Sequence, residues 1–346
     1  MAKTLTMDAS ALDGQGFDST SYFADFFAGI ADDGSTFYGG TPDAAFGSTY
    51  YMNGSQNVRT YNDGTDPVSS AVILDGADIA YDFIHYGAHM GHGISGSVDT
   101  LWFGDWIDGT TTGTEGTGEA GRVTGFGTEV VVDGLDLYAA AGSGSDAATN
   151  EVYSVYKNVQ DGDAAGLEAL FSEYAVEMIG TSSADKLVGY GNDDVLIGNA
   201  GADVLTGASG ADVLLGNRGA DKLRGGDGAD MLLGGNGNDN LFGGRGADVL
   251  KGGSGDDVLN GAKGTDRLTG GDGADTFVML ANSGRDTITD FDTSEDMIDV
   301  SALGLTQLSD FSISETASKT VLTSGSVEIH LLDIAQADLS DDLFVF

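Results

Sequence analysis

Three of the four histidines of the chain lie within eight positions of one another, in the segment YDFIHYGAHMGHG that begins at Tyr81. They are His85, His89 and His92, and Tyr86 stands among them. Imidazole and phenolate groups at this spacing can bind a metal ion or exchange a proton near neutral pH. The segment therefore predicts a metal site or a proton-transfer site.

The spacing of His85 and His89 is that of the zinc-protease motif H-E-x-x-H, but the neighbouring residues do not suit such an enzyme. Tyr86 stands where the glutamate that acts as general base is required. The glycines of the segment would each cost a helix about 1 kcal/mol relative to alanine. We therefore do not expect a zinc protease. A zinc or copper site formed by His85, His89 and His92 remains an alternative.

The charge of the chain limits its partners. It has 55 acidic and 14 basic residues among 346, a formal net charge of −41. Such a surface repels phosphate backbones and anionic lipids, so nucleic acid and membrane partners are not expected. The absence of cysteine excludes disulfides, zinc–thiolate sites and iron–sulfur clusters. The N-terminus shows no apolar signal-peptide core, and no run of about 18 apolar residues predicts membrane insertion.

An aspartate recurs every nine residues from Asp185 to Asp275. A large apolar residue follows each aspartate by two positions, and the consensus is G-G-x-G-x-D-x-L-x. A flexible linker would need no such phasing, whereas a parallel β-roll requires it. In a roll the glycines form turns, the leucines point inward and the aspartates face a calcium ion. The predicted calcium ligands are Asp194, Asp203, Asp212, Asp221, Asp230, Asp239, Asp248, Asp257, Asp266 and Asp275.

This pattern resembles the RTX, or hemolysin-type, calcium-binding repeats. The first repeats depart from it, because Ser183 and Asn192 replace the middle glycine. We expect these turns to bind calcium weakly and to act as a cap. Later glycine pairs are interrupted at Ala208, Asn217 and Ala262, so a site in every turn is not expected.

The region after the roll contains GRDTITDFDTSEDMIDVS and ends in DLFVF. It resembles the C-terminal domain of serralysin-type secreted proteins, which implies an uncleaved signal for the type I secretion apparatus. An ordinary edge strand that closes the roll is the alternative. Without calcium, an Asp- and Gly-rich chain repels itself and stays unfolded, whereas extracellular calcium stabilises the folded roll. The region therefore favours an export and folding module.

The first half of the chain is typical of an α+β domain. STSYFADFFAGIA and DAAGLEALFSEY predict amphipathic helices, the second with Asp163 as its N-cap. Strands are predicted at SSAVILDG, ADIAYDFI, GSVDTLWFGD and TEVVVDGLDLYA, which form an antiparallel meander. The predicted architecture is an α+β N-terminal domain (1–178) with an antiparallel sheet packed with helices, a parallel β-roll (179–279) and a β-rich C-terminal cap (280–346).

LDGADIAY, followed by histidine and GSVDTLWFGD, resembles the haem-binding core of HasA-type hemophores. EVYSVYKNVQDGDAAGLEALF resembles the helical end of the same domain. The resemblance implies that Tyr81 is the phenolate ligand of ferric haem, a chemistry that suits Fe(III). A nearby imidazole would accept a hydrogen bond from the phenol, and its protonation near pH 6 would release the haem.

Two histidines could assist Tyr81. Counting back from the GSVDT anchor selects His92, which we favour, and counting forward from Tyr81 selects His89. Tyr86 is the alternative iron ligand. The region after the first helix, expected to form a loop, has no histidine, so Phe37 or Tyr38 would cover the other face of the haem, or that face would stay open.

These resemblances imply a secreted, extracellular bacterial protein that captures haem and delivers it to an outer-membrane receptor. Haemoproteins would be a source of the haem. The protein is expected to be a monomer, to be exported by a type I apparatus without a cleaved N-terminal signal, and to have no enzymatic activity. A calcium-dependent adhesin or structural protein that binds no haem is the alternative function.

Overall fold

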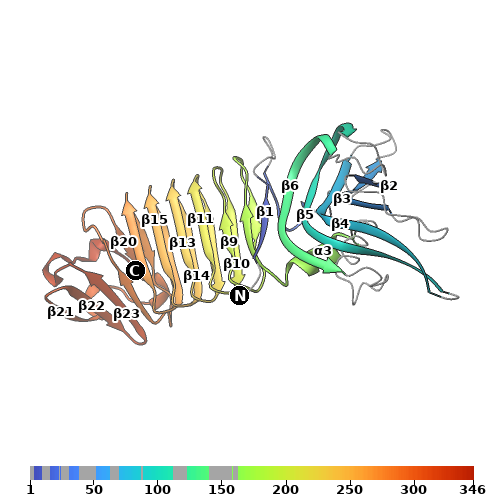
Figure 1. The fold of residues 1–346 in the computed structure, drawn as a ribbon. Helices are drawn as coiled ribbons and strands as arrows, with labels where there is room; N and C mark the ends of the chain where they lie inside the picture. Colours follow the sequence, from blue (N-terminus) through green and yellow to red (C-terminus); the bar gives the residue numbers. More distant parts are fainter. Residues whose placement is uncertain are drawn as a thin grey trace. The chain divides into compact units, whose positions relative to one another are not determined.

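The computed structural model describes the backbone of residues 4–9, 16–22, 24, 31–38, 52–62, 70–86, 89–111, 123–139, 158 and 163–346, and the side chains of residues 5–9, 16–22, 24, 158 and 163–346. The chain divides into two compact units (Figure 1). One contains Met1–Leu12 and Ser21–Tyr174, and the other contains Asp13–Thr20 and Ala175–Phe346. No helix in the described part is long and apolar enough to cross a membrane.

The first unit contains an antiparallel meander in which each strand from β2 to β6 pairs with the next, and β1 pairs with β6. Asp163 caps helix α3, since its carboxylate accepts a hydrogen bond from the backbone N–H of Gly166. Leu167 and Phe171 are its buried residues. The bounds are β1 Thr4–Asp8, β2 Ala31–Tyr38, β3 Met52–Asn62, β4 Ser70–Tyr86, β5 His89–Thr111, β6 Val123–Ala139 and α3 Ala164–Phe171.

Three expectations for this meander were wrong. SSAVILDG and ADIAYDFI form one continuous strand, β4, because the DGAD sequence between them sits in an irregular pairing with β3 instead of a turn. Strands β4 and β5 also continue through the segment expected to be a loop, leaving only positions 87 and 88 between them. Phe37 and Tyr38, expected in a loop, belong to strand β2.

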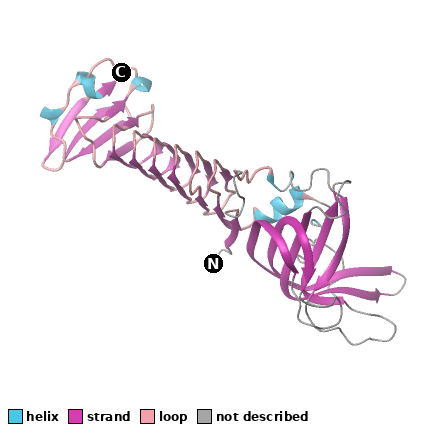
Figure 2. Cartoon of the chain, turned by 90° about the horizontal axis from the view of Figure 1, so that it is seen from above, coloured by secondary structure: helices cyan, strands magenta, loops and turns pink. Residues whose placement is uncertain are grey.

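The second unit contains the predicted parallel β-roll, whose successive strands alternate between two sheets (Figure 2). Each strand pairs in parallel with the strand two places later, which in most of the roll gives a register of 18 residues, two nonapeptides. The strands are β7 Ala175–Ile179, β8 Lys186–Val188, β9 Val195–Ile197, β10 Val204–Ser209, β11 Val213–Arg218, β12 Lys222–Asp227, β13 Met231–Asn236, β14 Asn240–Gly246, β15 Val249–Ser254, β16 Val258–Gly264, β17 Arg267–Asp272, β18 Thr276–Val278, β19 Arg285–Ile288 and β20 Met297–Asp299.

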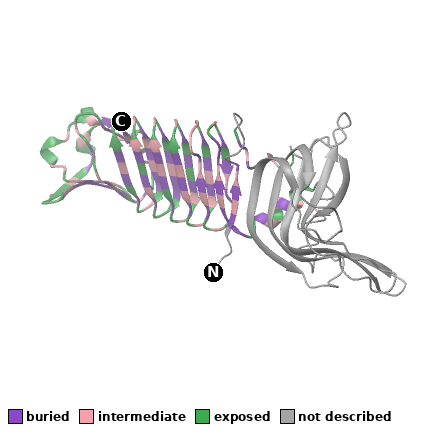
Figure 3. Ribbon diagram, turned by 45° about the horizontal axis from the view of Figure 1, so that its top comes forward, coloured by how far each residue is buried: buried purple, intermediate pink, exposed green. Residues whose placement is uncertain are grey.

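The core of the roll is the row of apolar residues that follow the aspartates. From Leu187 to Phe277 they are almost completely inaccessible to solvent (Figure 3). The turns require close backbone approach: Gly246 has a φ of 144°, and a Cβ there would collide with the carbonyl of Gly228. Ala208 and Asn217 also adopt positive φ. The roll is therefore continuous where the sequence interrupts its glycine pairs.

The C-terminal region continues both sheets. Strands β21 Ser312–Thr316, β22 Lys319–Ser324 and β23 Val327–Leu332 form an antiparallel extension, and β23 pairs in parallel with β19. The terminal strand β24, Phe344–Val345, pairs in parallel with β20, and Phe344 is buried. The DLFVF segment therefore contributes an edge strand to this sheet, and its role as a secretion signal stays a prediction. Four short 3₁₀ helices lie between these strands: η1 Ser301–Leu303, η2 Leu308–Asp310, η3 Gln336–Asp338 and η4 Asp341–Leu343.

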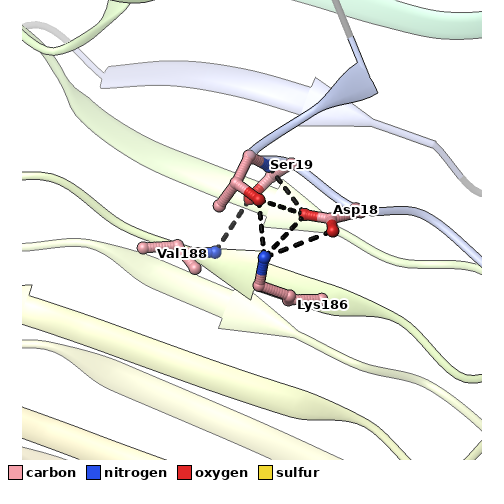
Figure 4. Close-up of polar contacts among 5 residues, drawn as sticks. Asp18, Ser19, Lys186 and Val188 are labelled. Atoms are coloured by element: carbon pink, nitrogen blue, oxygen red, sulfur yellow. Dashed lines mark hydrogen bonds and ion pairs between the residues drawn. The ribbon is translucent and has the colours of Figure 1, made fainter. Parts of the chain in front are cut away.

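A segment from near the N-terminus closes the other end of the roll (Figure 4). The backbone N–H of Phe17 donates a 2.5 Å hydrogen bond to the carboxylate of Asp185. Asp18 forms a parallel β-bridge with Lys186 through the backbone and a 3.2 Å ion pair with it through the side chains. The hydroxyl of Ser19 accepts a 2.8 Å hydrogen bond from the backbone N–H of Val188. Residues 17–19 thus occupy the position of a preceding turn. This segment has no repeat signature, so the cap could not be predicted from the sequence.

Candidate calcium sites of the roll

All ten aspartates predicted as calcium ligands are buried, one before each strand of the repeat array. Each uses Oδ1 to accept a hydrogen bond from the backbone 18 residues earlier. For example, Asp230 N–H donates to Asp248 over 3.0 Å. The same bond links Asp203 N–H to Asp221 over 2.8 Å. A backbone N–H of the preceding turn of the roll therefore holds one oxygen of each carboxylate in place.

The second carboxylate oxygen distinguishes the interior of the array from its start. In nine aspartates Oδ2 is buried and has no hydrogen-bond partner among the described residues. A buried anionic oxygen without a partner costs several kcal/mol, so a cation is the expected partner. These aspartates are Asp203, Asp212, Asp221, Asp230, Asp239, Asp248, Asp257, Asp266 and Asp275.

Asp194, the first of the ten predicted ligands, differs from the other nine. Its Oδ1 accepts a hydrogen bond from Val176 N–H, and its Oδ2 accepts one from Tyr190 N–H at 2.7 Å. Asp185 is similarly occupied by hydrogen bonds from Thr181. The first turns therefore use their carboxylates as hydrogen-bonded caps, and weak calcium binding there stays a prediction.

Each unpartnered oxygen lies against a glycine five residues earlier in the chain. A Cβ at Gly225 would lie within 3.0 Å of Oδ2 of Asp230 and of the carbonyl oxygen of Gly243. Glycine therefore leaves space where a carboxylate oxygen and a backbone carbonyl from the next turn converge. Among the described residues no three His, Cys, Asp or Glu side chains converge on one point. A set of one carboxylate with carbonyls is all oxygen, as calcium prefers.

The electrostatics of the row also favour a cation. Burial raises the pKa of Asp248 to about 7, even though the N–H of Asp230 stabilises its charged form, and the negative charges of Asp266 and Asp230 raise it further. Burial likewise raises the pKa of Asp203, Asp257 and Asp266 to about 7 and of Asp212, Asp239 and Asp275 to about 6. Keeping these carboxylates ionised at neutral pH lowers the stability of the folded roll, and a bound cation would offset that loss.

Two further aspartates extend the row and do not follow the nine-residue period of the sequence. Asp266 N–H donates to Asp286, and Asp275 N–H donates to Asp296 over 2.9 Å. These pairs are 20 and 21 residues apart, so a search for a nine-residue period passes over them. A usable signal was present, because each is followed after two positions by isoleucine, as in the repeats.

The candidate haem residues lie on strands whose side chains are outside the described residues. Backbone pairing places Tyr81 opposite Ile94 and Phe83 opposite His92. Since a strand alternates with a period of two, positions 81 and 92 fall on one face of the β4–β5 hairpin. Tyr86 pairs with His89, and these two positions fall on the other face. The register thus groups Tyr81 with His92.

The position of His85 also follows from this register. His85 pairs with Met90 and shares the face of positions 81 and 92. The zinc or copper alternative needs His85, His89 and His92 together, but position 89 belongs to the opposite face. Phe37 and Tyr38 pair with Asn57 and Gln56 on the neighbouring strand β3. Their predicted contact with the haem lies outside the described residues.

We predict that Gly243→Ala abolishes one calcium site. The added methyl group would lie against Oδ2 of Asp248 and the carbonyl of Gly261, closing the space between them. Bound calcium should fall by about one ion per chain, measured by calorimetric titration of chelator-treated protein. Gly191→Ala is the matched control, since a Cβ there meets nothing within 4 Å. Equal calcium stoichiometry in the two variants would contradict the assignment.

The roll is similar in sequence to a known repeat family. Residues 179–214, 206–241, 215–250 and 242–277 match the RTX calcium-binding nonapeptide repeat in four copies. The chain is 37% identical to the AlgE6R3 subunit of a mannuronan C5-epimerase from Azotobacter vinelandii, over 35% of this chain and 80% of that one, with a TM-score of 0.32. No curated protein sequence is significantly similar to the chain.

Two further solved structures are similar at low identity. The hemophore HasA from Yersinia pestis is 17% identical over 48% of this chain and 86% of that one, with a TM-score of 0.34. The extracellular lipase LipA from Serratia marcescens is 17% identical over 50% of this chain and 40% of that one, with a TM-score of 0.24. At these values neither similarity carries a functional argument.

Proposed function

We propose that this chain is a secreted hemophore-like protein with a calcium-folded export module. Residues 179–277 match the RTX calcium-binding nonapeptide repeats, and this match supports the export module. The nine unpartnered aspartate oxygens support the calcium part of the proposal. The tyrosine–histidine segment of β4 and β5 supports the haem part. Export by a type I apparatus and delivery to an outer-membrane receptor complete the proposal.

The calcium concentration would determine whether the chain is unfolded, as export requires, or folded, as haem binding requires. Where calcium is scarce, the buried carboxylates repel one another and the roll does not compensate for its ordering entropy. Outside the cell, calcium would bind only the folded roll and stabilise it by mass action. The chain would then pass the exporter unfolded and fold after release.

The observation that carries the haem proposal is the register of the β4–β5 hairpin. Positions 81 and 92 fall on one face of paired strands, two positions apart across the hairpin. Tyr81 would bind ferric iron as a phenolate, and His92 would accept a hydrogen bond from the phenol and favour its ionisation. Protonation of His92 would weaken that support, which predicts haem release near pH 6.

Titration of the calcium-loaded protein with ferric haem tests this proposal. Tyr81→Phe removes only the ligating oxygen, so we expect the tyrosinate charge-transfer bands to vanish and the affinity to fall by at least about 100-fold. Tyr86→Phe is the matched control from the other face and should bind as the wild type does. His92→Ala should weaken binding by about 10- to 100-fold, whereas His89→Ala should not.

The other outcomes of the titration identify the alternatives. Loss of haem binding in Tyr86→Phe instead would transfer the ligand to Tyr86. Spectral changes upon zinc or copper addition that depend on His85 would favour the histidine metal site. A folded, calcium-loaded protein without a saturable haem complex would sink the hemophore proposal and leave the adhesin or structural protein as the better account.

A further inference from the structure

Two adjoining hollows lie on the outward face of the sheet that contains β10, β12, β14 and β16. One has a volume of about 550 Å³ and the other of about 440 Å³. They share the residues Thr206, Arg224 and Phe242, so together they form one groove across neighbouring strands. We call this feature the roll groove and define it by the residues that line the two hollows.

The charge of the roll groove is opposite to that of the chain. Four exposed basic residues line it, Lys222, Arg224, Arg245 and Lys263, and Asp227 is the only acidic residue among those that line it. The whole chain has 55 acidic and 14 basic residues. Arg245 forms a 3.1 Å ion pair with Asp227, so the lining residues keep three cations in excess of their carboxylates, which indicates a local surface that fits an anion.

Strand register builds the groove. Gly226 and Gly244 pair on neighbouring strands and form a floor without side chains. On one side of this floor Arg224 pairs with Phe242, and its guanidinium lies 5.3 Å from the centre of the Phe242 ring. On the other side Asp227, Arg245 and Lys263 follow one another, with strands spaced by about 4.8 Å. An extended ligand could therefore run across the strands between two walls.

The neutral residues of the groove indicate what kind of anion fits. The hydroxyls of Thr206 and Ser209 line it, and so does the half-buried ring of Phe242. Guanidinium and ammonium groups bind carboxylates, hydroxyls bind other hydroxyls, and an aromatic ring packs against the C–H face of a sugar. We propose that the roll groove binds an acidic polysaccharide, with one sugar carboxylate at Arg224 and another near Lys263.

A nucleic acid fits this surface less well than an acidic sugar. Single-stranded nucleic acids are bound by several aromatic rings on which successive bases stack, whereas Phe242 is the only aromatic residue among those that line the groove. The cations of the groove attract an anionic ligand only at short range, once the ligand is in contact with the groove. The inference depends on the folded roll and does not depend on haem binding.

Calorimetric titration of the calcium-loaded full chain with short oligogalacturonates tests this inference. Oligomers too short to gel with calcium serve as the probe, and the neutral galactose oligomers of equal length serve as the comparison. Arg224→Gln with Lys263→Gln should lower the affinity by about tenfold or more, because each change removes a charge-assisted hydrogen bond. The matched control is Lys251→Gln with Arg267→Gln, two exposed cations on the other sheet.

Saturable binding of the acidic oligomer that is lost in the groove variant and retained in the control variant would support the inference. Circular dichroism and calcium stoichiometry equal to wild type would show that the groove variant is folded. Equal losses in the two variants would overturn it, because binding would then follow net charge alone. No saturable binding, equal binding of the neutral oligomer, or tighter binding of a single-stranded oligonucleotide would also overturn it.

Discussion

Removal of calcium with a chelator is expected to unfold the roll completely. Nine buried carboxylate oxygens would lose their only partner, and each uncompensated buried charge costs several kcal/mol. A domain is usually stable by only about 5–15 kcal/mol, so even a few empty sites exceed that margin. Far-ultraviolet circular dichroism should show a cooperative loss of strand signal on chelation and its recovery when calcium is restored.

Magnesium is the informative control for this experiment. It demands a near-octahedral shell and retains several waters, so a site of one carboxylate and backbone carbonyls should not bind it strongly. Equal concentrations of magnesium should therefore fail to restore the strand signal. A roll that keeps its strand signal in excess chelator would show that the aspartate row is stable without a cation.

Acid is expected to replace calcium in part. In the metal-free roll the pKa of seven of these carboxyls is raised to about 6 or 7. The pKa of these carboxyls is higher in the folded roll than in the unfolded chain. Their contribution to the free energy of unfolding is therefore fully present below about pH 4 and is lost as the pH rises through 6 to 7. Lowering the pH should therefore stabilise the folded metal-free roll by roughly several kcal/mol in total over the seven carboxyls. This figure already allows for partial screening of these groups by solvent.

The calcium-loaded protein should respond to pH in the opposite direction. Protons compete with calcium for the same carboxylates, so calcium affinity should fall as the pH drops below about 6 to 7. We expect chelated protein to gain strand signal, and calcium-loaded protein to release calcium, as the pH falls from 8 towards about 4.5. Asp248→Asn imitates a protonated carboxyl, so it should lose one calcium site and yet resist chelation better than wild type. A metal-free roll whose strand signal rises with pH instead would contradict the linkage.

The sequence was sufficient to predict the roll because its period is repeated eleven times. A nine-residue phase of aspartate and leucine determines both the inward row and the turns. The aspartate–leucine phase alone does not separate Asp194 from its successors, because that difference depends on a hydrogen bond from the Tyr190 backbone; in the sequence only the loss of glycine at Asn192 pointed to it. Nor could it reach Asp286 or Asp296, where the spacing changes but the contact persists.

The N-terminal half was less predictable because its signals are local. The DGAD sequence of β4 has the composition of a turn, yet an irregular pairing with β3 keeps it within a strand. The segment around Phe17 has no pattern that relates it to the repeats, and the hydrogen-bond partner described for Phe17 belongs to the folded roll. By contrast, the Asp163 cap of α3 was predictable because a cap and its helix are adjacent in sequence.

The bond between Phe17 and Asp185 joins residues 168 positions apart. The polypeptide between them, which includes most of the first unit, is thereby a closed loop inserted into the second unit. Closing a loop of this length has an entropic cost of several kcal/mol, which grows only slowly with length. Once calcium has ordered the roll and its cap has docked, both ends of the inserted segment are held, so the segment folds from a smaller ensemble than a free chain would. The order of folding would then run from the C-terminal half backwards, against the direction of synthesis.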